Sequence, residues 1–95
     1  MTKEEKHEAL FAGLVMMFHA AAMQQLGKTK NPATDKVERN LEQAQMSIDM
    51  LDMLEVRTRN NVSAEEAKLL KNALQDLKLN YVDEVGKDQA AANPS

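Results

Sequence analysis

The segment from Ala9 to Met23 contains no charged residue, and this feature constrains the fold more than any other. Its length of about 15 residues falls short of the roughly 18–20 apolar residues that span a bilayer. The length suits the core of a secretion signal, but the residues before it carry more glutamate than lysine, whereas a signal begins with a positive segment. We therefore expect a cytoplasmic protein that buries this segment.

A helix through this segment would be apolar on nearly every side. Two adjacent rows of apolar side chains recur at helical spacing: Leu10, Leu14, Met17 and Ala21 form one, and Phe11, Val15, Phe18 and Ala22 form the other. Such a helix must be buried nearly all round. A chain of 95 residues makes at most one domain, so few other elements are available to cover it.

Turn residues divide the chain into segments with helical period. Gly27 is expected to end the first helix in the left-handed conformation, and Gly86 to end the third. Residues 87–95 are polar and alanine-rich with nothing to pack against, so we predict a disordered tail after a single helical domain over residues 1–86. No strand pattern is present. The predicted fold is all-α, with helices near residues 4–26, 41–58 and 64–84.

Capping residues set the starts of the second and third helices. Asn40 is a good N-cap, and Gln43 three residues later completes a capping box, although Asp35 offers a rival start one turn earlier. Ser63 with Glu66 forms a second capping box. The loop between these two helices is short, which predicts that they form an antiparallel hairpin beside the long apolar helix.

The second and third helices differ in how much surface they need to bury. The third carries one apolar stripe, made of Ala67, Leu70, Leu74, Leu77 and Tyr81. The second carries two stripes on nearly opposite faces: one is Leu41, Ala44, Ile48 and Leu51, and the other is Met46, Met50 and Met53. We interpret the methionines as core filling, either between the first two helices or across a dimer.

The surplus of apolar surface predicts oligomerisation. Two helices within one chain cannot cover the first helix on all sides, and the simplest cover is a second copy related by two-fold symmetry. Gly13 has two readings, as part of a small-residue contact between copies or as space for a side chain of the second helix. The predicted interface consists of Ala9, Leu10, Gly13, Leu14, Met17, Phe18, Ala20, Met46, Met50 and Met53.

No group of residues indicates catalysis or a cofactor site. Cysteine is absent, which excludes thiolate chemistry, disulfides and Cys-ligated metals. His19 has no second histidine at ligand spacing, so we interpret it as a histidine hydrogen-bonded to a neighbour. Four carboxylates along the second helix are interpreted as a solvated face: Glu42, Asp49, Asp52 and Glu55. We expect no enzymatic activity, no cofactor and no metal ion.

Charge argues against nucleic acid as a partner. The net charge is −3, which opposes binding to a phosphate backbone. The cations of the first loop, Lys28, Lys30, Lys36 and Arg39, stand among acids and lack the aromatic neighbours that stack on bases. We interpret this segment as a solvated loop.

The order of several short motifs resembles a bacterial family catalogued as domain of unknown function number eighteen forty-four. The likeness covers about Leu10 to Val82. The resemblance implies a short, helical, bacterial protein, and the family has no established activity, cofactor or catalytic residues to carry over. The motifs are Leu14-Val15-Met16-Met17-Phe18, Gln25-Leu26-Gly27-Lys28, Asn31-Pro32, Asn40-Leu41-Glu42-Gln43-Ala44, Ile48-Asp49-Met50-Leu51, Met53-Leu54, Glu65-Glu66, Leu69-Leu70, Leu77 and Tyr81-Val82.

These observations favour a non-enzymatic protein that oligomerises or acts as an adaptor for an unidentified protein partner. The alternative is a peripheral membrane protein whose apolar first helix enters the interface. Against membrane binding, that helix has no tryptophan and no basic flank. A small ligand-binding helical protein is a weaker alternative.

Overall fold

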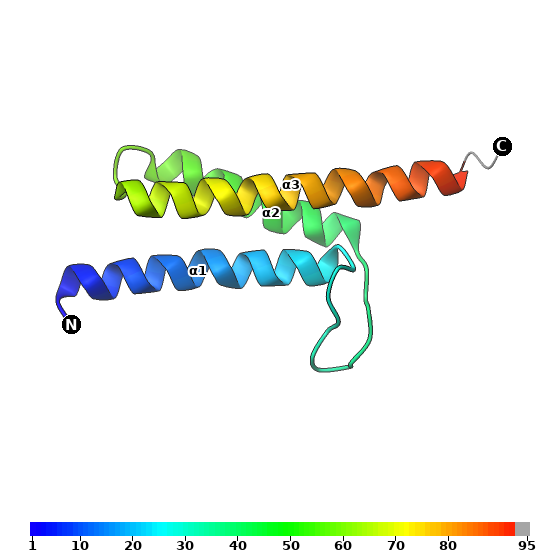
Figure 1. The fold of residues 1–95 in the computed structure, drawn as a ribbon, viewed down its shortest axis with the longest axis horizontal. Coiled ribbons are helices and arrows are strands. Elements are labelled where there is room, and N and C mark those ends of the chain that lie inside the picture. Colours follow the sequence, from blue (N-terminus) through cyan, green and yellow to red (C-terminus); the bar gives the residue numbers. More distant parts are fainter. Residues whose placement is uncertain (93–95) are drawn as a thin grey trace.

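The computed structural model describes residues 1–92, which form an all-α domain of three helices. The helices are α1 (Lys3–Gln25), α2 (Leu41–Thr58) and α3 (Ala64–Ala92). Each helix contacts the other two. The chain runs along α1, reverses through α2 and returns along α3, so that α2 and α3 form the predicted antiparallel hairpin (Figure 1). The predicted three-helix, all-α fold is confirmed.

Local capping explains where the helices begin. The Ser63 hydroxyl accepts from the Glu66 backbone N–H at 3.1 Å, and the Glu66 carboxylate accepts from the Ser63 N–H at 2.8 Å. This is the reciprocal capping box that the sequence predicts at the start of α3. Asn40 caps α2 by accepting from the Gln43 N–H, but the Asn40 N–H donates to the Gln25 carbonyl, so only half of the predicted box forms.

The end of α3 differs from the prediction. Gly27 adopts φ +79° just after α1, as expected of a left-handed helix end, whereas Gly86 lies inside α3, which continues to Ala92. The predicted boundary at Gly86 is therefore wrong. Ion pairs on both sides of this glycine support the longer helix, because Lys87 reaches back to Glu84 and Asp88 binds Arg39. Residues 87–92 of the predicted tail are helical, and residues 93–95 lie outside the described part.

The core lies where the three helices meet. Only two residues of α1 are fully buried, Val15 and Ala22, so this helix is covered on one side and not nearly all round. Leu26 joins them just after the helix ends. The buried residues of the hairpin are Ala44, Ser47, Ile48, Leu51, Leu70, Ala73, Leu74, Leu77 and Glu84. The predicted Leu41–Leu51 stripe of α2 and most of the α3 stripe face this core. Ala67 and the methionine stripe of α2 are exposed.

Within residues 1–92, no helix combines the length and the apolar character that crossing a membrane requires.

Candidate functional site

The most prominent surface feature is an apolar face across α1 and α2, which we call the α1–α2 apolar face. Met17 is 65% exposed and Met46 is 60% exposed, although large apolar side chains are usually buried. The interpretation of the methionines as core filling within one chain is therefore wrong for all the internal ones except Met23, which packs against the core. The face consists of Leu10, Leu14, Met17, Met46, Met50 and Met53, each between 38% and 65% exposed.

Two polar contacts show that the α1 part of this face lies beside α2. The Ser47 hydroxyl donates to the Gln25 side-chain oxygen at 2.7 Å, which marks the α2 side of α1. The His19 ring lies 2.6 Å from the Asp76 carboxylate, which marks the α3 side. At about 100° per residue, Leu14 lies about 20° from Gln25 and about 140° from His19 around the helix axis.

The methionine stripe of α2 lies on the same side of the molecule. Ser47 marks the side of α2 that faces α1, and Asp52, which binds Lys78 at 3.0 Å, marks the side that faces α3. Met50 lies about 60° from Ser47 and about 160° from Asp52 around the axis of α2. Leu14 and Met50 therefore border the seam between α1 and α2, on the side away from α3. Met46 and Met53 lie about 100° and 120° from Ser47 around the axis of α2, so they continue the face outward on α2.

The residues that the sequence predicts for an interface are almost all on the surface. Phe18 is the exception, because it is half-buried and packs against the core. A Cβ added to Gly13 would meet no atom within 4 Å in the described part of the chain, so Gly13 does not make space for a side chain of α2. The exposed residues are Ala9, Leu10, Gly13, Leu14, Met17, Ala20, Met46, Met50 and Met53.

His19 makes the neighbour contact that its position predicts. Its Nε2 and the Asp76 Oδ2 are 2.6 Å apart, and the other oxygen of Asp76 accepts from the Asn80 amide at 3.2 Å. Among residues 1–92, no three histidine or carboxylate side chains gather as metal ligands would. The pair ties α1 to α3.

An ion-pair cluster around the buried Glu84 joins the first loop to α3, and the sequence analysis missed it. Glu84 is only 5% exposed, and its carboxylate lies 2.7 Å from Lys28, 2.7 Å from Lys87 and 3.1 Å from Arg39. The Arg39 guanidinium also donates to the Glu84 backbone carbonyl at 2.7 Å. The interpretation of the first loop as solvated is therefore incomplete, because Lys28 and Arg39 form ion pairs with α3, although Arg39 stays exposed. Heptad spacing was the available signal, since Glu84 follows buried Leu77 by one heptad.

These contacts shift the pKa values of side chains in the cluster. Hydrogen bonds from Lys28 and Lys87 lower the pKa of Glu84 from its usual 4.5 to about 2, against the effect of burial. The hydrogen bond to Lys28 also lowers the pKa of Asp83, and its reciprocal effect raises the pKa of Lys28. All these groups are charged near neutral pH, so the cluster fastens the loop to α3 and holds no proton for chemistry.

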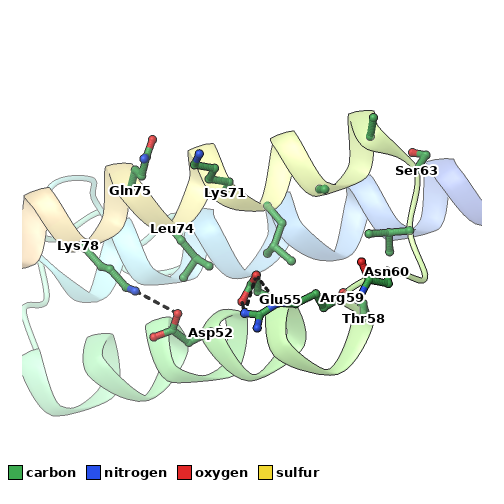
Figure 2. Close-up of a pocket in the computed structure, with 14 residues that line it drawn as sticks. Asp52, Glu55, Thr58, Arg59, Asn60, Ser63, Lys71, Leu74, Gln75 and Lys78 are labelled. Atoms are coloured by element: carbon green, nitrogen blue, oxygen red, sulfur yellow. Dashed lines mark hydrogen bonds and ion pairs between the residues drawn. The ribbon is translucent and has the colours of Figure 1, made fainter.

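A groove of about 630 Å³ lies between the end of α2 and the start of α3 (Figure 2). Its floor is apolar, formed partly by Leu70 and Leu74. The charged groups at its rim pair with one another: Arg59 binds Glu55 at 2.8 Å, and Lys78 binds Asp52 at 3.0 Å. Two of the four predicted surface carboxylates are therefore neutralised by cations instead of forming an acid pair.

Together the fold and these surfaces define an all-α domain of three helices that carries an exposed apolar face. The chain belongs to the family described as Domain of unknown function (DUF1844), whose family model matches residues 8–83. The match includes α1 from its second turn, all of α2 and most of α3. No curated protein and no solved structure matches the chain.

Proposed function

We propose that the protein is a non-enzymatic oligomeriser or adaptor of the bacterial cytoplasm, and that two copies associate through the α1–α2 apolar face. The exposed face is the observation that carries this proposal. A soluble monomer rarely exposes a contiguous apolar patch larger than a few hundred Å². In a symmetric dimer the same face on both copies would be covered at once. An unidentified protein partner would bind the assembled dimer.

The energy available from this face is of the size that association requires. Burying a large apolar side chain completely stabilises by about 1.5–3 kcal/mol. Since the six side chains of the face are roughly half exposed, each copy would gain about 6 kcal/mol and a dimer about 12 kcal/mol. That gain is comparable with the about 4–15 kcal/mol that association costs in lost freedom of motion.

Sedimentation velocity at micromolar concentration tests the proposal. We expect the wild-type chain to sediment at twice its monomer mass. Met17→Glu places a charge in the face and should give a folded monomer. Leu79→Glu is the matched control, because Leu79 is 74% exposed on α3, outside the face, and this variant should remain a dimer. A wild-type monomer would contradict the proposal.

Vesicle flotation separates this proposal from membrane binding. The face could also enter the interface of a lipid bilayer. We expect the wild-type dimer to remain at the bottom of a gradient with vesicles of either neutral or anionic phospholipid. Co-flotation that Met17→Glu abolishes would favour the membrane over a second copy.

A further inference from the structure

We infer that the second copy packs with its α1 antiparallel to the first, about a two-fold axis that passes midway between Val15 and Met16. This inference rests on the proposed dimer and adds the register and direction of the contact. It concerns the row of α1 formed by Leu10, Leu14, Met17 and Ala21, of which the first three are exposed and Ala21 is half-buried.

The spacing of this row is symmetric. Its members are separated by four, three and four residues, so the row reads the same in both chain directions. An antiparallel contact centred on the row brings Leu14 of each copy beside the partner's Met17. The same contact brings Leu10 beside the partner's Ala21. A two-fold axis requires one patch to complement itself, and this row meets that requirement.

Charge selects the antiparallel direction over the parallel one. The start of α1 carries the exposed acids Glu4, Glu5 and Glu8. Of the four cations in residues 28–39, Lys28 and Arg39 are already paired with acids of α3, which leaves Lys30 and Lys36. An antiparallel pair brings the glutamates of one α1 toward these two lysines of its partner. A parallel pair would place like charges together, which raises the free energy of the complex.

The groups needed for this attraction are accessible. Lys30 and Lys36 take part in no ion pair among residues 1–92, in contrast to Lys28 and Arg39. Residues 1–10 are all exposed, and α1 extends past the α2–α3 loop at its N-terminal end (Figure 1). In the inferred register Glu4 comes level with the partner's Gly27, where the loop that carries Lys30 begins. Opposed helix dipoles favour the same direction.

The register also uses Met50 of α2. Because α2 is antiparallel to α1 and Ser47 contacts Gln25, Met50 is level with the C-terminal half of α1 and lies near the α1 side of α2. In the antiparallel pair this half of α1 faces the partner's N-terminal half. Met50 then comes near the partner's Leu10, a residue that is 61% exposed within its own chain.

Engineered disulfides test the register, since the chain contains no cysteine of its own. In the inferred pair the two copies of position 10 lie about 16 Å apart along the axis, as do the two copies of position 21. A disulfide requires Cα atoms within about 7 Å. Neither Leu10→Cys nor Ala21→Cys should therefore form a covalent dimer alone under mild oxidation, whereas an equimolar mixture should.

Each remaining outcome is decisive. Self-cross-linking of both single variants would show a parallel pair, and a dimeric mixture without cross-links would show that this row does not pair in this register. Either result overturns the register, and whether the dimer still forms through the α1–α2 apolar face is then decided by Met17→Glu in sedimentation. A monomer in sedimentation would overturn the dimer itself. Leu79→Cys, exposed on α3, should stay uncross-linked in every mixture and reports on random collision.

A distance measurement gives a second readout outside the contact. Nitroxide labels on Glu4→Cys, in the exposed start of α1, should lie about 35 Å apart along the axis of an antiparallel pair. Pulsed electron paramagnetic resonance on the dimer measures this separation. A short separation would indicate parallel helices and contradict the inference.

Discussion

Gly27 and Gly86 are both glycines, but Gly27 follows the end of a helix and Gly86 lies inside one. Gly27 has φ +79°, a conformation that side chains other than glycine rarely adopt. Gly86 lies in the interior of α3, where glycine costs helix stability. The sequence pattern alone predicts a helix end at both glycines, because the residue type does not distinguish the two backbone conformations.

Substitution by alanine should separate the two roles. Gly27→Ala should destabilise the fold by about 1–2 kcal/mol, because the left-handed conformation is strained for alanine and the new Cβ would lie 3.3 Å from the Arg39 Cβ. Gly86→Ala is the matched control and should stabilise by about 0.5–1 kcal/mol, because its Cβ would meet nothing within 4 Å. Urea denaturation at fixed protein concentration measures both. Equal changes in the free energy of unfolding for the two variants would contradict these two roles.

Glu84 is the residue through which pH should act on the fold. Its pKa of about 2 in the folded chain lies below its usual 4.5, so the folded state favours the ionised form. The contribution to stability is complete above about pH 4.5. It is lost as the pH falls toward 2, because the unfolded chain takes up the proton first.

We expect Glu84→Gln to lower the melting temperature by several degrees at pH 7, because Lys28, Arg39 and Lys87 lose their shared partner. The difference from wild type should shrink as the pH falls from 4.5 toward 2. Glu65→Gln is the control at an exposed carboxylate of α3 and should change little. Thermal melts followed by circular dichroism measure this, and a difference independent of pH would contradict the role of the carboxylate.

At the scale of the elements, two helices begin with the same reciprocal cap in different surroundings. Thr2 and Glu5 cap α1 where every residue up to position 10 is exposed. Ser63 and Glu66 cap α3 where α2 and α3 meet. An exposed helix end can fray without unfolding the rest, whereas the hairpin end is coupled to the core.

Removing each cap should show this difference. Ser63→Ala should lower the free energy of unfolding by about 0.5–2 kcal/mol, the usual cost of losing an N-cap. Thr2→Ala removes an equivalent cap and should have a smaller effect on global unfolding, because α1 frays locally. Urea denaturation measures the first quantity, and amide hydrogen exchange over residues 3–8 measures the second. A larger global loss for Thr2→Ala would contradict this assignment.

At the scale of the whole molecule, the three helices differ in length and are staggered. The domain measures 57 × 30 × 16 Å, so it is long and thin and has little interior. The first helix projects at one end and α3 at the other (Figure 1). This shape leaves apolar side chains of α1 and α2 exposed that a more compact bundle would cover.

The proposed dimer makes stability depend on protein concentration. Because dissociation accompanies unfolding, each tenfold dilution should lower the melting temperature by roughly 3–6 °C. Met17→Glu, as a monomer, should melt at a temperature independent of concentration. Differential scanning calorimetry across two decades of concentration tests this, and a constant wild-type melting temperature would count against coupled dissociation.

The sequence by itself determined the number of helices, their order and most of their ends. Apolar period and local caps act over three or four residues, so they can be read without knowledge of the fold. This information located α2 and predicted the left-handed Gly27. It also predicted which side chains of α1 form a surplus apolar surface.

Only the tertiary structure decided which of those apolar side chains are covered. Val15 is buried and Leu14 is partly exposed, although both belong to a helix that is apolar on most sides. The choice depends on where α2 and α3 pack, which is set by contacts between residues far apart in the chain. Glu84 shows the same limit, since its burial requires Lys28 and Arg39, which lie more than 40 residues earlier. Local sequence patterns do not show which distant residues pair. These pairings decide both the end of α3 and the shape of the exposed face.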